Sequence, residues 1–137
     1  MTDRDTIAEL VHGYALAIRR GDPAAAAALF AGDGSFETRE VDPRFPAASR
    51  RLSLSEGREA VARYVTSATA AVRMLPMIHN LMIEITGEVA GASSLMVGRL
   101  WPQGGEVIGE YADRFCREGG QWRFAARVYT IFREQEG

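Results

Sequence analysis

The stretch GEYADRFCREGGQWRFAARVYTIFR, residues 109–133, predicts the architecture around which the rest of the chain is organised. Apolar and aromatic residues alternate with charged ones on both sides of Gly119-Gly120. A period of two is typical of strands with two different faces, and the glycine pair is typical of a turn between them. The sequence therefore predicts two long, paired strands at this end of the chain.

The register of this hairpin decides which side chains meet. If Glu118 pairs with Trp122 across a three-residue loop, Asp113 lies opposite Arg127. A loop shorter by one residue would turn Arg127 to the other face, because a register slip flips every side chain. We expect the first register, since a carboxylate that faces a guanidinium needs no further partner.

Helical periodicity marks the beginning of the chain. Apolar residues recur at helical spacing within Asp3–Arg20, where Thr2 is a suitable N-cap and Gly21 a suitable stop. A second helix is predicted from Asp22, as its N-cap, to about Phe30.

The region that follows mixes strand and loop signals. Ser35–Val41 is a candidate strand, and Asp42–Arg51 is a predicted loop, because it contains two prolines and lacks periodicity. This loop is also a candidate lid over a bound molecule. Ser53 or Ser55 then caps a third predicted helix.

After Pro76 the apolar period changes to two, which predicts a meander of four strands: Met77–Thr86, Val89–Trp101, Val107–Arg117 and Gln121–Arg133. At roughly 10–13 residues these strands exceed the usual ~5–6, and strands that long twist and coil. The predicted fold is α+β, one domain over residues 1–137. A strongly curved antiparallel sheet forms a cone, with three N-terminal helices packed on its concave face. The interior of such a cone is a cavity suited to a small apolar ligand or substrate.

Composition narrows the classes of partner. The net charge is −2, and the 16 basic residues are all arginines that form no cluster, so nucleic acid is not expected as a partner. The single Cys116 cannot form an internal disulfide. We expect no signal peptide and no membrane span, and therefore a cytoplasmic protein. The two histidines lack suitably spaced ligands, so we expect no metal, and no nucleotide loop points to a cofactor.

Three segments together resemble the SnoaL-like group of the nuclear transport factor 2-like superfamily: LVHGYALAIRRGDPAAAAALFAGDGSF, IHNLMIEITGEVAGASS and GEYADRFCREGGQWRFAARV. The resemblance covers nearly the whole chain and implies the cone-shaped α+β fold and a homodimer. It also implies cofactor-independent acid–base chemistry, as in polyketide cyclases, steroid isomerases, scytalone dehydratase and bile-acid dehydratases. Other members only bind a ligand or assemble, so the resemblance does not select one activity.

The resemblance carries over to individual residues. Tyr14 matches a tyrosine of the first helix that lines the pocket in dehydratase-like members, and His79 matches the histidine at the start of a strand. Asp113 matches the acid of a Tyr-x-Asp strand, and Arg127 matches an arginine of the last strand. Arg19 departs from the pattern, because dehydratase-like members tend to carry an aspartate there.

The chemistry of these residues suggests catalytic roles. In a regular strand His79 shares a face with Leu81 and Ile83, so in an apolar pocket it could act as a general base near neutral pH. The alternative is a core histidine bonded to a backbone carbonyl. Tyr14 could polarise a substrate carbonyl, and Tyr111 and Tyr129, which face each other in the expected register, could bind the substrate or only form the wall.

Two interpretations of Asp113 stay open. Paired with Arg127, it is an ionised structural residue that orients His79 or Tyr14. Unpaired in an apolar pocket, it would have a raised pKa and could donate a proton. Arg127 could likewise bind an anionic or enolate oxygen of a substrate, or serve only in the ion pair.

Two functions are therefore compatible with the sequence. The first is a cofactor-independent lyase, isomerase or cyclase that acts on a small apolar, oxygenated molecule of polyketide or steroid type. The second is a non-catalytic domain that binds a small ligand or dimerises through the outer sheet face. We expect that face to present Trp122, Phe124, Val128 and Phe132.

Overall fold

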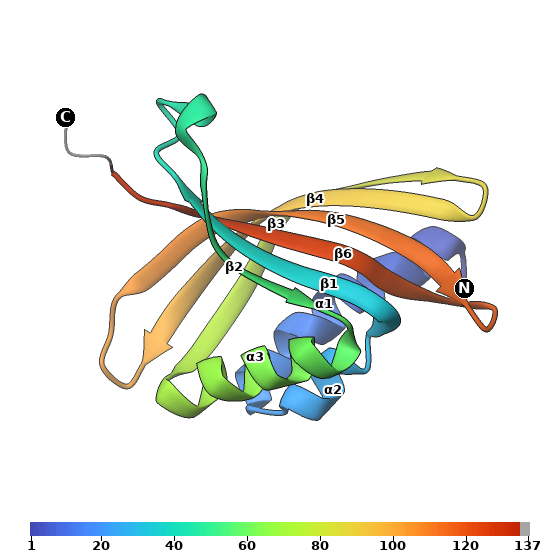
Figure 1. Cartoon of the computed structure of the whole chain (residues 1–137), viewed down its shortest axis with the longest axis horizontal. Coiled ribbons are helices and arrows are strands. Elements are labelled where there is room, and N and C mark those ends of the chain that lie inside the picture. Colours follow the sequence, from blue (N-terminus) through green and yellow to red (C-terminus); the bar gives the residue numbers. More distant parts are fainter. Residues whose placement is uncertain (135–137) are drawn as a thin grey trace.

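Three α-helices cover one face of a six-stranded sheet in the computed structural model, which describes residues 1–134 (Figure 1). The elements in chain order are α1 (Asp3–Arg20), α2 (Pro23–Ala27), β1 (Phe30–Val41), the 3-10 helix η1 (Pro46–Ala48), β2 (Arg50–Glu56), α3 (Arg58–Ala71), β3 (Arg73–Thr86), β4 (Val89–Trp101), β5 (Glu106–Glu118) and β6 (Gln121–Phe132). The predicted α+β class is confirmed. The face that carries the helices is called the inner face below, and the opposite one the outer face.

The sheet is mixed and mostly antiparallel. Its strand order is β2-β1-β6-β5-β4-β3, so the predicted meander of four long strands forms one side. Two strands, β1 and β2, extend it on the other side. β1 runs parallel to β6 and antiparallel to β2.

The helix ends follow local chemistry. Thr2 and Asp5 form a capping box at the start of α1, and Gly21 ends it in the left-handed conformation with φ of 66°. The prediction that the second helix reaches Phe30 is wrong. The helix ends at Ala27, and Phe30 begins β1 because its fully buried ring packs against Phe124 of the neighbouring strand.

The prediction of a helix capped by Ser53 or Ser55 is also wrong. These residues lie in β2, where the hydroxyl of Ser53 is 2.5 Å from that of Thr38 on β1. The third helix begins instead after Gly57, whose N–H donates to the carbonyl of Gly34. Short polar side chains that could cap a helix here pair with a neighbouring strand.

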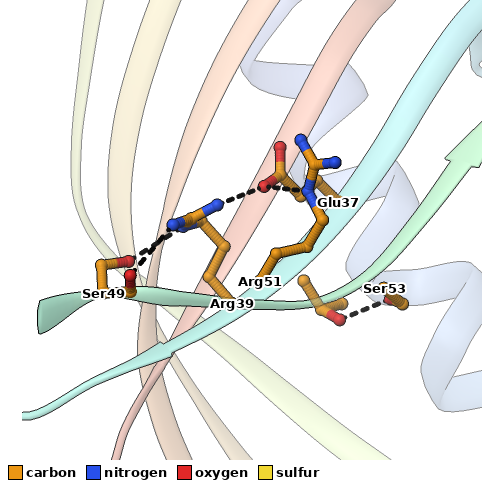
Figure 2. A network of polar contacts seen from close by, with 6 residues as sticks. Glu37, Arg39, Ser49, Arg51 and Ser53 are labelled. Carbon is orange, nitrogen blue, oxygen red and sulfur yellow. Dashed lines mark hydrogen bonds and ion pairs between the residues drawn. The ribbon is translucent and has the colours of Figure 1, made fainter.

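Arginine–carboxylate contacts hold the β1–β2 hairpin together. Glu37 of β1 accepts hydrogen bonds from Arg39 at 2.6 Å and from Arg51 of β2 at 3.0 Å, and Arg39 also donates to Ser49 (Figure 2). The turn of this hairpin projects away from the helices (Figure 1), and none of residues 42–51 lines the inner cavity described below. The predicted lid is therefore wrong.

The β5–β6 hairpin reaches the expected pairing by a different route. Its turn has two residues, because Glu118 pairs with Gln121 rather than with Trp122. A bulge at Ala125 then restores the phase, so Asp113 pairs with Arg127 as predicted. Tyr111 and Tyr129 are also opposite each other, with ring centroids 4.8 Å apart.

The core lies between the helices and the inner face, and aromatic rings fill much of it. Tyr14 packs edge-on against Phe30 and Phe124 and stacks with Phe36. The prediction that Trp122 and Phe124 belong to the outer face is wrong, because both are buried in this core.

Candidate functional site

A cavity of about 340 Å³ remains between the helices and the inner face of the sheet. Helices α1 and α3 and strands β1, β3, β4, β5 and β6 all contribute to its wall. We call it the inner cavity. Its lining is mostly aliphatic and aromatic, and the polar groups are hydroxyls from six residues: Tyr14, Thr38, Tyr64, Thr69, Tyr111 and Tyr129.

Three of these hydroxyls have partners in the protein. Tyr129 donates to the carbonyl of Met96 at 3.2 Å, Thr38 is bonded to Ser53, and Thr69 donates to the carbonyl of Val65. The partners hold these side chains as parts of the wall. They are consequently less able to serve a bound molecule than a hydroxyl that has no partner.

The hydroxyls of Tyr14, Tyr64 and Tyr111 form no hydrogen bond with any of residues 1–134. Tyr14 and Tyr111 are at most 5% exposed and line the cavity from α1 and β5. Buried tyrosine hydroxyls normally find a partner. These two therefore offer hydrogen bonds to a molecule in the cavity.

A buried ion pair lies behind this tyrosine wall. Arg127 donates to the two carboxylate oxygens of Asp113 at 2.9 and 3.2 Å, and both side chains are fully buried. The guanidinium carbon is 3.5 Å from the ring centroid of Tyr111 and 4.6 Å from those of Tyr14 and Phe124. The predicted pairing of Asp113 with Arg127 is therefore confirmed.

The environment sets the protonation states of the site. Burial raises the pKa of Tyr14 well above its ordinary value and that of Tyr111 to about 12, so both are protonated donors at neutral pH. The positive charge of Arg127 acts against burial and lowers the pKa of both tyrosines, which makes their hydroxyls stronger hydrogen-bond donors. Burial also raises the pKa of Asp113, and the charge and hydrogen bonds of Arg127 limit the rise.

His79 lies outside the inner cavity, so the prediction that it faces the apolar interior is wrong. Its neighbour Ile78 pairs with the buried Met96, whereas His79 pairs with Leu95 on the outer face and is exposed. A bulge follows at once, with Asn80 at a φ of 53°. The extra residue shifts the phase of the strand, which is why Leu81 and Ile83 face inward and His79 does not.

The remaining predicted site residues form two groups according to their position. Tyr14, Tyr111 and Tyr129 come together at the inner cavity, and Asp113 with Arg127 lies behind them. The sequence did not single out Tyr64 as a cavity residue, although its place on the apolar stripe of α3 is a signal for it.

Within residues 1–134, no group of three or more histidine, cysteine, aspartate or glutamate side chains is arranged to hold a metal ion. No helix there is long and apolar enough to cross a membrane.

The fold is of the nuclear transport factor 2-like type. A family model for the SnoaL-like domain matches residues 1–128, and the chain belongs to that family. No curated protein matches the chain in a sequence comparison.

Solved structures of similar fold come from several bacteria. A variant of the Mycobacterium tuberculosis protein Rv3472, of unknown function, is 29% identical with a TM-score of 0.78, over 94% of this chain and 71% of that one. A candidate scytalone dehydratase from Novosphingobium aromaticivorans is 18% identical with a TM-score of 0.76, over 96% and 85%. A nuclear transport factor 2-like protein from the same organism is 21% identical with a TM-score of 0.76, over 97% and 84%. At these identities the last two show the fold alone.

Proposed function

We propose that the chain binds a small, mainly apolar, oxygenated molecule of polyketide or steroid type in the inner cavity. Tyr14 and Tyr111 donate hydrogen bonds to an oxygen of that molecule. The observation that carries the proposal is that the buried Tyr14 and Tyr111 line a mostly apolar cavity and their hydroxyls, like that of Tyr64, have no partner within residues 1–134. A volume of about 340 Å³ falls within the range of roughly 300–1,000 Å³ that is usual for ligand sites.

Binding without proton transfer accounts for the lining better than acid–base catalysis. Among residues 1–134, those that line the cavity include no carboxylate and no imidazole. Asp113 is engaged by Arg127, and His79 lies on the outer face. Protonated tyrosines can donate hydrogen bonds at neutral pH but cannot accept a proton, so the lining supplies donors and no general base.

A cofactor-independent lyase or isomerase is a second candidate. The hydroxyls of Tyr14 and Tyr111 favour it, and the fold is shared with the candidate scytalone dehydratase from Novosphingobium aromaticivorans. A carbonyl held by Tyr14 and Tyr111 is polarised, because the donors stabilise negative charge that develops on its oxygen. Such a reaction would need its base from the substrate or from water.

A matched pair of ligands tests the hydrogen bonds. 1-Tetralone carries a carbonyl, and tetralin has the same bicyclic body without it. By calorimetry, Tyr111→Phe should weaken 1-tetralone binding about 3- to 10-fold, the value of one hydrogen bond, and leave tetralin binding unchanged. Tyr14→Phe should do the same. Equal losses for both ligands would show that the hydroxyls do not bind the oxygen.

A second pair of variants tests the location. Ala68 lines the inner cavity, so Ala68→Phe should fill part of it and weaken both ligands. Ser67→Phe adds the same ring one residue earlier, at an exposed position outside the lining, and is the control. Unchanged binding to Ala68→Phe would place the ligand elsewhere.

A further inference from the structure

At the end of α3 the inner cavity adjoins a shallow external hollow of about 320 Å³, which is called the opening below. Thr69 and Val72 line both the cavity and this hollow, and Arg73 and Trp101 also contribute to the hollow. Arg73 lies between Val72 and Met74, both of which line the cavity. A molecule that fills the cavity and extends through this opening would therefore meet Arg73 first.

Two more arginines lie at the end of α1, which Arg73 contacts. Arg73 donates from Nη1 to the carbonyl of Arg19 at 3.2 Å, so its side chain reaches the C-terminal end of α1. Arg19 and Arg20 are exposed and follow Ile18, which lines the cavity. The start of β3 and the end of α1 thus bring three arginines near one another, and Arg73 among them lines the opening.

These three arginines lack the ion pairs that most other arginines of the chain form. Within residues 1–134 no carboxylate pairs with Arg19, Arg20 or Arg73. Arg19 and Arg20 suit the negative end of the α1 dipole, but that effect does not require a third arginine from another element. Unpaired positive charge beside an apolar cavity attracts an anion, because the low-dielectric wall focuses the field.

We propose that the natural ligand is an amphiphilic anion. Its apolar body occupies the inner cavity, and its carboxylate lies at the opening, where Arg73, Arg19 and Arg20 bind it. This inference rests on the proposed function and adds the class of ligand. Arginine suits the role because its guanidinium donates two parallel hydrogen bonds to a carboxylate.

Decanoate and its neutral methyl ester are the probes, because they share the apolar chain and the ester lacks the negative charge. Calorimetry at low salt should give Arg73→Met and Arg20→Met each about a 3-fold weaker affinity for decanoate, the usual value of an exposed charge pair, with no change for the ester. Raising the salt concentration should weaken decanoate and not the ester. Arg63→Met is the control, because Arg63 is an exposed arginine of α3 that lies away from the opening and forms no ion pair within residues 1–134.

Each outcome decides the inference separately from the proposed function. The inference of an anionic ligand would be overturned if wild type, Arg73→Met and Arg20→Met bound decanoate with equal affinity. It would also be overturned if the protein bound 1-tetralone but not decanoate. Because Arg73 also caps α1, its variant could lose stability, so the comparison with Arg20→Met decides in that case. Failure of 1-tetralone, decanoate and the ester alike would overturn the proposed function as well.

Discussion

Replacing Asp113 with leucine leaves the guanidinium of Arg127 buried without its counter-ion. Both side chains are fully buried, and the rings of Tyr14, Tyr111 and Phe124 enclose the cation, so water cannot replace the lost carboxylate without disturbing the core. Nη1 of Arg127 already lacks a partner among residues 1–134. We expect a loss of about 3–5 kcal/mol in the free energy of unfolding, the usual cost of breaking a buried pair from one side.

The double variant Asp113→Leu/Arg127→Met removes both charges and separates two explanations. If the cost comes from an unpaired cation, the double variant should be more stable than Asp113→Leu alone, because apolar replacements of a buried pair are often close to neutral. If the cost comes from lost packing, the second substitution should add to the first. Loss of the ring contacts of Arg127 should leave the double variant about 0.5–2 kcal/mol below wild type.

Urea unfolding at pH 7, followed by tryptophan fluorescence, measures these free energies. Trp122 is 2% exposed and belongs to the same strand as Arg127, so its emission reports on this part of the sheet. The loss for Asp113→Leu would be a third or more of the stability of a domain near the middle of the usual range of about 5–15 kcal/mol. A loss below about 1 kcal/mol, or a double variant less stable than the single one, would refute the reasoning.

Three other predictions concern the sheet. A β-carbon at Gly109 would clash with the Thr130 carbonyl and lie 2.8 Å from the Tyr129 ring, so Gly109→Ala should lower the free energy of unfolding in urea by about 1–3 kcal/mol. Gly91→Ala is the control and should cost less, because the nearest atom to its β-carbon is 3.5 Å away. Equal losses for the two variants would contradict this prediction. Hydrogen bonds, chiefly from Arg39, lower the pKa of Glu37 below its ordinary 4.5, so its contribution to stability is present above that pH and lost as the pH falls through the folded pKa. Glu37→Gln should flatten the decline of melting temperature below pH 4.5, and an unchanged decline would exclude this role. A homodimer through the outer face stays a prediction. Met82 is 68% exposed on that face, so Met82→Glu should dissociate the dimer. A monomeric mass of the wild-type protein by light scattering would contradict the prediction.

Long periodic segments made most of the fold predictable. The four C-terminal strands and α1 carry enough alternating or helical positions, and a capping residue in the case of α1, for their type to be read from the sequence. β2 could not be read in this way. Its seven residues are too few to establish a period, and Ser53 is equally suited to cap a helix or to bond Thr38 across a sheet.

The candidate site was predictable where no irregularity intervened. Tyr14 lies on a regular helix, so the stripe of α1 placed it in the interior correctly. His79 lies beyond a bulge, and a period of two counted back from Ile83 therefore assigned it to the wrong face. An asparagine in the left-handed region is the one local sign of that bulge, and Asn80 alone does not require it.

The Asp113–Arg127 pair was predicted correctly although the loop was not. Side-chain chemistry favoured the pairing, and the chain reaches it through a two-residue turn and a bulge at Ala125. A chemical requirement on two side chains thus predicted the register better than loop length did.

The parallel pairing of β1 with β6 affects how the protein can form during synthesis. β1 is followed in sequence by β2 and α3, but its other neighbour in the sheet is the last strand, which ends at Phe132. A ribosome must therefore release almost the whole chain before β1 gains that neighbour, and until then Phe30 and Phe36 lack the strand against which they are buried. Contacts this distant in sequence slow folding, so a chaperone that shields the nascent N-terminal half should raise the yield of folded protein.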